Sequence, residues 1–427
     1  VPKVDSHMGT YHSAKAGAGR GAAAVQFEDS AWRADDLPHD WQVEQPFDEN
    51  ENLDHGYKPR GIAWYRRRFH LDESDRGKRI VLEFGGVATH CTVWVNGQLM
   101  HRNWCGYTPF VIDATDMAFY GDRPNVVAVR VDADAFEGWW YEGAGIYRHT
   151  WLVKTDPLHI APWGVFVNPR KESDTDWVTR VETSVVNDGC EEQSFEVVST
   201  VIDPGGKQAT STLSELSLKP GQSTTIVQEP TVSGPALWSC ESPNLYVLRT
   251  EVRRGTETVD DQVTRFGYRT IAFDADKGFF LNGEPVKLKG TCNHQDHAGV
   301  GVAVPDSVQE FRIRRLREMG SNAYRCAHNP PAPALLDACD RLGMLVMDEN
   351  RNFGSDPEHL EQLRTMVRRD RNHPSVILWS LFNEEPLQNT PLGARLSATM
   401  MREIKKLDAS RPVTAAINAT VQRDESA

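Results

Sequence analysis

Two carboxylates and an amide follow a short apolar run late in the sequence. Val376–Ser380 is rich in β-branched and aromatic residues and follows Pro374, which is typical of a strand buried on both faces of a parallel sheet. Asn383, Glu384 and Glu385 come shortly after it. A carboxylic acid held at the C-terminal end of a barrel strand, half in an apolar wall, would have a raised pKa and could donate a proton. Alternatively, these acids mark a polar strand exit and complement the dipole of a following helix.

The surrounding sequence favours the first interpretation. Residues 371–386 read Arg-Asn-His-Pro-Ser-Val-Ile-Leu-Trp-Ser-Leu-Phe-Asn-Glu-Glu-Pro, which resembles the acid/base signature of glycoside hydrolase family 2. That family contains β-galactosidases, β-glucuronidases and β-mannosidases. The resemblance implies that Glu384 is the catalytic acid/base, which protonates the glycosidic oxygen, and that Asn383 binds the 2-hydroxyl of the sugar.

The elements that would position these residues are alternating strands and helices, which begin after Arg269 and indicate parallel βα units. Strands are predicted at 286–290, 323–326, 344–349, 376–380 and 412–417, and helices at 307–319, 333–342, 360–369 and 392–407. Ser307 and Glu310 form the pattern of a capping box at the start of the first helix. Its predicted inner stripe consists of Val308, Phe311, Ile313, Leu316 and Met319.

Polar residues follow each of the first four predicted strands. They are His294, Asp296 and His297, then Arg325 and His328, then Asp348, Glu349 and Asn350, and finally Asn383 and Glu384. A single histidine at a strand end is usually structural. Placing polar residues at four consecutive strand ends would cost desolvation free energy with no benefit unless they had a function, so we expect a functional site there. Family resemblance in 290–297, 325–328 and 348–350 implies that His294 and His328 contact the sugar or stabilise the transition state, and that Arg325 orients carboxylates. We also assign Asp348 and Glu349 to substrate binding.

Two all-β regions precede the βα units. Short strands between residues 32 and 155, with a hairpin signal at Asn96–Gly97, predict a jelly-roll-like β-sandwich. Motifs at 37–41, 61–66, 93–97 and 143–148 resemble the sugar-binding domain of family 2. Trp139 and Trp140 cannot both face one core from a strand, and we assign Trp140 to substrate binding, although aromatic residues in a sandwich are more often core. Residues 157–270 predict an immunoglobulin-like spacer.

Composition sets outer limits on these expectations. The chain has 427 residues, of which 39% are hydrophobic and 25% charged, and about two to four globular domains are expected. The net charge of −13 argues against nucleic-acid binding, and no apolar run approaches the length of a membrane span. The seven dispersed cysteines lack zinc-ligand spacing and favour no disulfide framework. No signal peptide is visible; a periplasmic or secreted location is favoured, but the compartment stays open.

The predicted architecture is multidomain β plus α/β. We expect a jelly-roll-like β-sandwich at 1–156, an immunoglobulin-like β-sandwich at 157–271, and the N-terminal part of a (β/α)8 TIM barrel at 272–427. A complete barrel needs eight strands, and five are predicted. The unpaired edge at 412–417 predicts an oligomer or aggregate.

The second carboxylate of a retaining glycosidase is not evident. The resemblance implies a nucleophile beyond Ala427, because the only glutamates after Glu384 are Glu385, Glu403 in a helix and Glu425 in a polar tail. We therefore expect a carbohydrate substrate, first a β-galactoside and alternatively a β-glucuronide or β-mannoside, or else a non-catalytic carbohydrate-binding protein. Residues 351–354 lack the ligands of the family's magnesium site, so no metal and no cofactor is expected.

Overall fold

The computed structural model describes residues 19–134 and 137–418, so Glu425 lies outside the described residues. The chain divides into two compact units. The first comprises residues 1–155 together with Asp296–Pro305, and the second comprises Asp156–Gln295 together with Asp306–Ala427.

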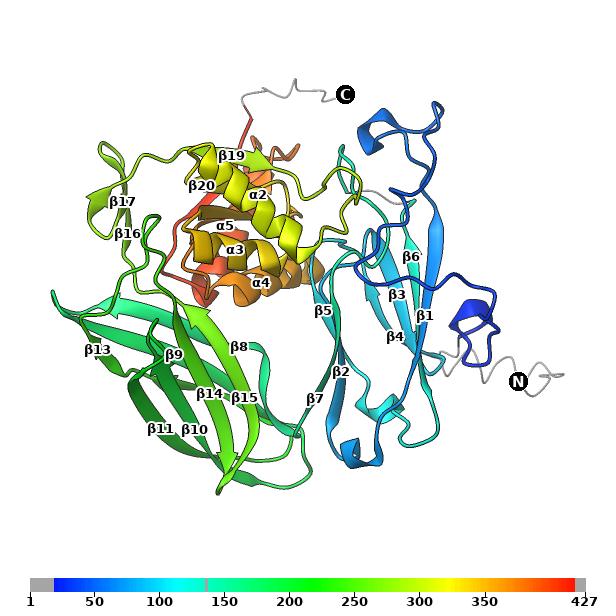
Figure 1. Cartoon of the computed structure of the whole chain (residues 1–427), viewed down its shortest axis with the longest axis horizontal. Helices are drawn as coiled ribbons and strands as arrows, with labels where there is room; N and C mark the ends of the chain where they lie inside the picture. Colours follow the sequence, from blue (N-terminus) through cyan, green and yellow to red (C-terminus); the bar gives the residue numbers. More distant parts are fainter. Residues whose placement is uncertain (1–18, 135–136, 419–427) are drawn as a thin grey trace. The chain divides into compact units, whose positions relative to one another are not determined.

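The first unit contains two antiparallel sheets (Figure 1). The first sheet has the strand order β1-β6-β3-β4, and the second has the order β5-β2-β7. Their bounds are β1 Ile62–Phe69, β2 Arg79–Phe84, β3 His90–Val95, β4 Gln98–Asn103, β5 Phe110–Asp113, β6 Asn125–Asp132 and β7 Thr150–Thr155. The predicted hairpin joins β3 and β4, with Asn96 at φ 50° and Gly97 at φ 80°. The fold is a jelly-roll-like β-sandwich, as predicted.

A buried carboxylate fixes the segment Asp296–Pro305 within this unit. Asp40 is 2% exposed and accepts hydrogen bonds from the backbone amides of Val302 and Ala144, each at 3.0 Å. The hydroxyl of Tyr141 donates to the same carboxylate at 2.9 Å. Because Asp40 binds groups from distant parts of the sequence, it ties these segments into one unit.

The first part of the second unit is an immunoglobulin-like β-sandwich. One sheet has the order β11-β10-β14-β15, and the other contains β8, β9, β12 and β13. The bounds are β8 Leu158–Lys171, β9 Asp176–Asn187, β10 Gln193–Ile202, β11 Gln208–Leu218, β12 Gln222–Gln228, β13 Thr231–Ser233, β14 Tyr246–Arg254 and β15 Glu257–Phe266. Burial alternates strictly along β9, as the alternating sequence predicts.

A parallel five-stranded sheet with the order β19-β20-β21-β22-β23 follows a small antiparallel sheet of β16–β18. The small sheet consists of β16 Ile271–Asp274, β17 Gly278–Leu281 and β18 Glu284–Pro285. The parallel strands are β19 Gly290–Asn293, β20 Ala323–Cys326, β21 Leu345–Glu349, β22 Val376–Asn383 and β23 Val413–Ala416. The helices between them are α2 Asp306–Glu318, α3 Pro333–Leu342, α4 Pro357–Asp370 and α5 Pro391–Leu407 (Figure 1). This region is part of a TIM barrel, as predicted, and β22 is buried along nearly its whole length.

Three details of this region were predicted incorrectly. The first parallel strand begins at Gly290 and not at Val286. Helix α2 begins at Asp306, so Ser307 lies inside the helix and does not cap it. The predicted inner stripe is also partly wrong, because Phe311 is 46% and Met319 is 67% exposed.

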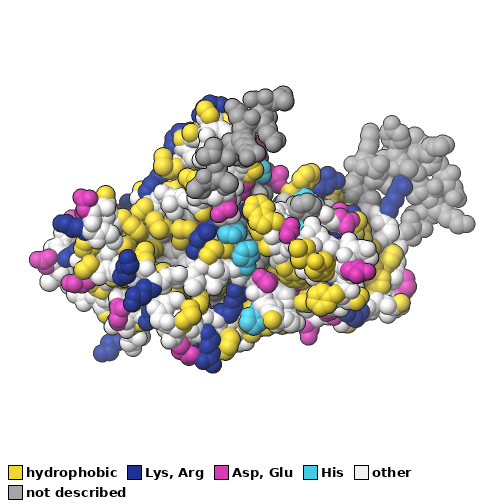
Figure 2. Space-filling view, turned by 90° about the horizontal axis from the view of Figure 1, so that it is seen from above, with side chains coloured by type: hydrophobic (Ala, Val, Ile, Leu, Met, Phe, Trp, Pro, Cys, Tyr) yellow, Lys and Arg dark blue, Asp and Glu magenta, His cyan; other side chains and the backbone are white. Residues whose placement is uncertain are grey.

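The surface of the described residues is mixed in character. On the face shown in Figure 2, basic, acidic and apolar side chains are interspersed. Among the described helices, none has the length and apolar character that crossing a membrane requires.

Candidate active site

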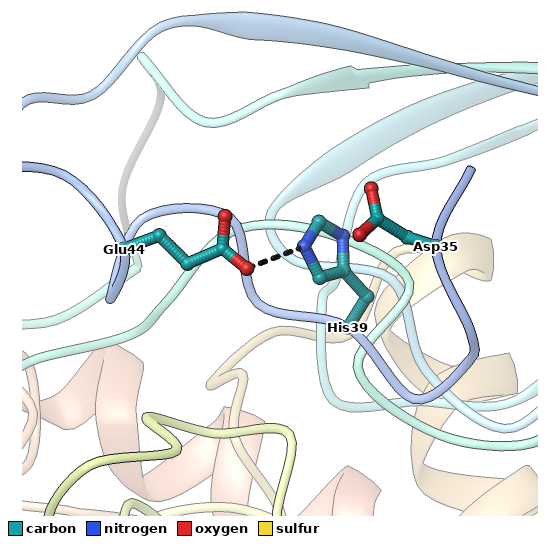
Figure 3. A group of neighbouring side chains, drawn as sticks. All are labelled: Asp35, His39 and Glu44. Carbon is teal, nitrogen blue, oxygen red and sulfur yellow. Dashed lines mark hydrogen bonds and ion pairs between the residues drawn. The ribbon is translucent and has the colours of Figure 1, made fainter. Parts of the chain in front are cut away.

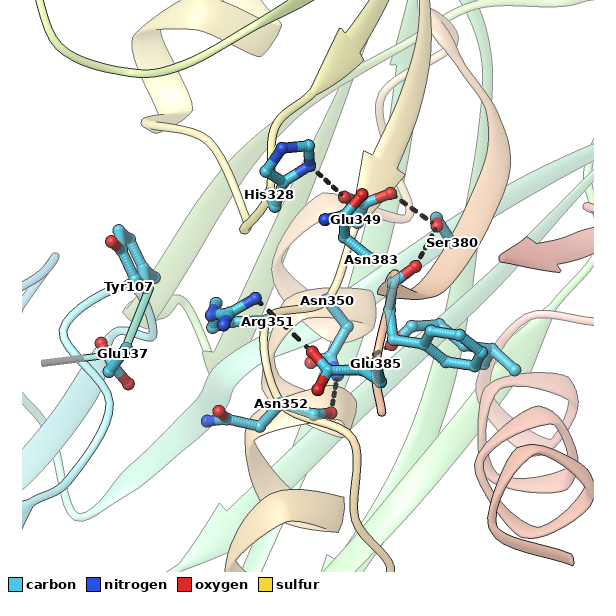
Figure 4. Close-up of polar contacts among 12 residues, drawn as sticks. Tyr107, Glu137, His328, Glu349, Asn350, Arg351, Asn352, Ser380, Asn383 and Glu385 are labelled. Carbon is cyan, nitrogen blue, oxygen red and sulfur yellow. Dashed lines mark hydrogen bonds and ion pairs between the residues drawn. The ribbon is translucent and has the colours of Figure 1, made fainter. Parts of the chain in front are cut away.

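Glu349 is the centre of a polar network at the C-terminal ends of the parallel strands. Its side chain is fully buried at the end of β21. Arg325 of β20 donates through Nε to Oε2 at 3.0 Å and through Nη2 to Oε1 at 2.8 Å. Ser380 of β22 donates through Oγ at 2.8 Å, and Nδ1 of His328 lies 3.2 Å away (Figure 4). The carboxylate therefore joins three neighbouring strands.

Arg325 connects Glu349 with Asn383. Its Nη2 donates to Asn383 Oδ1 at 2.7 Å and lies 3.0 Å from Nδ1 of His328. Burial lowers the pKa of Arg325, but the hydrogen bonds and charge of Glu349 outweigh burial, so the pKa is raised. The charge of Glu384 acts in the same direction. The structure thus brings Arg325, His328, Glu349 and Asn383 together, and Glu384 directly follows Asn383 in the sequence.

His294 joins this group from the end of β19. Its ring centroid lies 4.9 Å from that of His328, with the two rings at 86° to each other. This edge-to-face contact brings the polar end of a fourth strand into the same neighbourhood. Asp296 and His297, by contrast, belong to the first unit.

Glu384 turns the chain out of β22. Its φ is 51°, in the left-handed region that residues other than glycine rarely adopt. Its amide donates to the carbonyl of Ala416 at 2.8 Å, and Asn418 Nδ2 lies 3.4 Å from its Oε2. The side chain is exposed, so the expectation that it lies half in an apolar wall is wrong. The left-handed backbone of Glu384 interrupts the alternation of side-chain direction along β22. Glu385 is more buried than Glu384.

Glu385 forms a half-buried ion pair with Arg351. Its Oε1 lies 3.7 Å from Nη1 of Arg351, and its side chain is 21% exposed (Figure 4). Burial raises the pKa of Glu385, and the charge of Arg351 opposes this shift. The adjacent loop is fixed by Asn350, whose Nδ2 donates to the carbonyls of Asn352 at 2.6 Å and Leu381 at 3.2 Å. These contacts tie the ends of β21 and β22 together.

The structure does not bring Asp348 to the polar network around Glu349. Its side chain is fully buried, and the charge of Asp370 at the end of α4 acts on it. Successive residues of a strand point to opposite faces, so Asp348 and Glu349 cannot face the same site. Burial raises the pKa of Asp348 well above its usual range, and the charge of Asp370 raises it further.

Trp140 lies in the first unit. Its indole Nε1 donates to the hydroxyl of Tyr107 at 3.1 Å. The neighbouring Trp139 is 59% exposed and packs edge-on against Trp140, with ring centroids 5.8 Å apart. Of these two residues Trp139 offers more ring surface to solvent, and the assignment of Trp140 to substrate binding stays a prediction.

Two groups of described residues bring three potential metal ligands together. They are Asp35, His39 and Glu44, and Asp337, Asp340 and His373. In the first group, Glu44 Oε1 lies 3.2 Å from His39 Nε2 (Figure 3). Arg33 pairs with Asp35 at 2.6 Å and with Glu44 at 2.7 Å, so a guanidinium already balances both carboxylates. We assign no metal to either group.

Sequence reasoning did not identify Ser380 or Cys292 as part of this group. Ser380 is fully buried within an apolar strand, where a small hydroxyl residue gives no distinct signal. Cys292 is exposed on β19, and its Sγ lies 3.5 Å from Nη1 of Arg325. The register of the parallel strands would have identified both residues, because it pairs Ser380 with Glu349 and Cys292 with Arg325.

Three family descriptions match consecutive parts of the sequence. The sugar-binding domain of glycosyl hydrolases family 2 matches residues 23–156, a further family 2 description matches 158–269, and the family 2 TIM-barrel domain matches 274–355 and 351–425. The chain therefore belongs to glycosyl hydrolase family 2.

Named relatives agree with this assignment. The β-galactosidase BoGH2A of Bacteroides ovatus is 39% identical over 86% of this chain and 45% of its own length. The crystal structure of a family 2 member from Bacteroides cellulosilyticus has a TM-score of 0.90 and 35% identity, covering 94% of this chain and 55% of that one. The Bacteroides uniformis β-glucuronidase 2, covalently bound to cyclophellitol-6-carboxylate aziridine, has a TM-score of 0.83 and 29% identity over 93% and 51%. This chain spans about half the length of these relatives.

Proposed function

We propose that this chain carries the sugar-binding and proton-donating part of a retaining β-glycosidase, with Glu384 as the general acid/base. The observation that carries the proposal is the contact of Arg325 with both Glu349 and Asn383, beside Glu384. The carboxyl group of Glu384 is exposed, so it can come within hydrogen-bond reach of a bound glycoside, as a general acid/base must.

Asn383 is proposed to bind a sugar hydroxyl. Its Oδ1 accepts from Arg325 at 2.7 Å, which orients Nδ2 as the donor toward substrate. His328 and His294 would line the same part of the site, because their rings are in contact and His328 also faces Glu349. Glu349 would accept a hydrogen bond from the substrate at a fixed position, because Arg325 donates to both of its carboxylate oxygens.

A retaining mechanism also needs a nucleophile, with its carboxyl group about 5–5.5 Å from that of the acid/base. Glu403 is unsuited to this role, because it lies in α5 and is paired with Arg364 and Lys406. We propose that the nucleophile belongs to barrel strands that follow residue 427 in a longer form of the protein. For the 427-residue chain we therefore expect sugar binding without hydrolysis.

A β-galactoside is the proposed substrate, and a β-glucuronide is the runner-up. The 39% identity with a Bacteroides ovatus β-galactosidase supports the first, and the likeness to a β-glucuronidase supports the second. Calorimetric titration with phenyl β-thiogalactoside, phenyl β-thioglucuronide and phenyl β-thiomannoside would rank them, because thioglycosides resist hydrolysis. Tightest binding of the galactoside is expected, and preference for another sugar would overturn the ranking. Asn383→Ala should weaken binding, and the exposed Asn389→Ala serves as its control.

The alternative is a non-catalytic carbohydrate-binding protein. It is favoured by the lack of a suitable second carboxylate among the described residues that follow Glu384. Hydrolysis of 4-nitrophenyl glycosides by a form extended to the length of the relatives would exclude this alternative. No hydrolysis by the extended form, with sugar binding retained, would establish it.

Two further proposals concern organisation. We place domain boundaries at 156/157 and 271/272, between the ranges matched by the three family descriptions.

Association of the 427-residue chain is also proposed, because β23 is the edge of the parallel sheet and Ile417 after it is 61% exposed. Light scattering after size-exclusion chromatography should show an oligomer or aggregate, and a clean monomer would contradict this.

A further inference from the structure

The position of His294 is weakly determined by the sheet that precedes it. Strand β19 has four residues and, within residues 19–134 and 137–418, pairs with β20 alone at the edge of the sheet. The pairing covers Gly290 to Asn293 and ends one residue before His294. The strand is also only partly buried, so packing constrains it less than it constrains β21 or β22.

Arg312 of helix α2 holds the backbone at this point. Its Nη1 donates to the carbonyl of Gln295 at 3.1 Å, and its Nη2 donates to the carbonyl of His294. The guanidinium thus bridges two successive carbonyls directly after the strand. Its planar fork suits this bridge, whereas a lysine ammonium would replace it only in part. The side chain is half-buried, and its charge also acts on the buried Tyr324 of β20.

We propose that Arg312 is a positioning residue for the sugar-binding site, acting through His294. The inference rests on the proposed function, because it gives the His294 ring a role beside substrate. The ring of His294 contacts that of His328, whose Nδ1 lies 3.0 Å from Arg325 and 3.2 Å from Glu349. A shift of the His294 backbone would therefore alter the wall formed by these side chains.

The same helix offers a matched control. Arg314 is exposed, and its guanidinium pairs with Glu310 on the surface of α2. Substitution of Arg314 removes the same charge from α2 and leaves the bridge to His294 and Gln295 intact. A general effect of helix charge would appear in both variants, whereas a positioning effect would appear only at Arg312.

The test compares the 427-residue chain with Arg312→Met, Arg312→Lys and Arg314→Met. Calorimetric titration with phenyl β-thiogalactoside measures affinity, and amide hydrogen exchange measures protection of residues 290–295. We expect Arg312→Met to weaken affinity about tenfold, since a small displacement of a positioned group is costly. Exchange at 290–295 should become faster. Arg312→Lys should recover part of both losses, and Arg314→Met should match the unmodified chain.

Unchanged affinity and unchanged exchange in a folded Arg312→Met variant would overturn the proposal, as would equal losses in Arg314→Met. If the unmodified chain binds none of the three thioglycosides, the proposed function fails, while faster exchange at 290–295 in Arg312→Met still supports the role of Arg312 in holding this backbone. If Arg312→Met does not fold, Arg312→Lys and Arg312→Gln take its place, and wild-type affinity and exchange in both would overturn the proposal.

Discussion

Arg325 and Glu349 form a two-pronged ion pair between adjacent parallel strands, with N–O distances of 3.0 and 2.8 Å. The Glu349 side chain is fully buried and that of Arg325 is 23% exposed. This pair joins β20 to β21, and its guanidinium also reaches Asn383 on β22. The candidate active site is therefore built on an electrostatic link that crosses three strands.

Loss of Arg325 should be far more damaging than loss of a surface arginine. Arg325→Met leaves the Glu349 carboxylate buried without its main partner, which typically costs about 3–5 kcal/mol. The control is Arg76→Met, which breaks an exposed pair with Glu73 and should cost about 1 kcal/mol or less. Denaturant unfolding of both variants would test this, and similar losses would contradict the account of the buried pair.

The left-handed backbone of Glu384 should reverse the usual order of glycine and alanine. Glycine adopts φ near 51° without steric cost, so Glu384→Gly should be more stable than Glu384→Ala by about 1 kcal/mol. Leu387 in the same loop is exposed and has no left-handed φ, so there the alanine variant should be at least as stable. Unfolding free energies of the four variants measure the difference. The same order at both positions would contradict the assigned conformation.

The pKa of Asp348 predicts a specific dependence of stability on pH. Burial raises this pKa well above its usual range, so the folded chain keeps a proton that the unfolded chain releases above about pH 4. The associated stability is fully present below the unfolded pKa and is lost as the pH rises through the folded pKa. Asp348→Asn should therefore flatten the fall in unfolding free energy with rising pH and stabilise the chain at neutral pH. The exposed Asp116→Asn should leave the profile unchanged, and an unchanged profile in Asp348→Asn would contradict this.

Gly301 should be intolerant of any side chain because of its contact with Asp40. Its φ is 59°, and a Cβ atom would lie 2.0 Å from Asp40 Oδ2. Gly77 of the same unit also has a left-handed φ, but nothing lies within 4 Å of its Cβ position. Gly77→Ala should cost only the backbone strain, roughly 1–2 kcal/mol, and Gly301→Ala roughly 1–3 kcal/mol more. Thermal unfolding would measure both, and equal effects would show that Asp40 is not confined as described.

Local sequence signals predicted the regular elements well where caps and periodicity agreed. Helix α3 has the predicted bounds, because Pro333 begins it and Gly343 ends it with φ 70°. The start of α2 was misplaced, since the Ser-x-x-Glu pattern lies inside the helix. Phe311, assigned to its inner stripe, is exposed and lies under the guanidinium of Arg315, 5.1 Å from the ring centroid. The helical spacing of apolar residues does not predict such a contact on the surface.

The candidate site was only partly predictable, because strand-end position does not fix side-chain direction. Arg325 and Asn383 meet because parallel strands align their ends. Asp348 and Glu349 are both buried and have the same kind of sequence position, but Asp348 lies on the other face of the strand. The exposure of Glu384 depends on a single left-handed residue that no local sequence signal indicates.

The most direct test of the acid/base assignment is azide rescue of Glu384→Gln in a form extended to the length of the relatives. Loss of the general acid/base should lower hydrolysis of a β-galactoside with a poor leaving group by about 10²–10⁴-fold. Azide should restore turnover of a substrate with a good leaving group and yield the β-galactosyl azide. Glu385→Gln, which changes the neighbouring carboxylate, should retain most activity and should not respond to azide. Unchanged turnover in Glu384→Gln, or azide rescue of Glu385→Gln instead, would contradict the account.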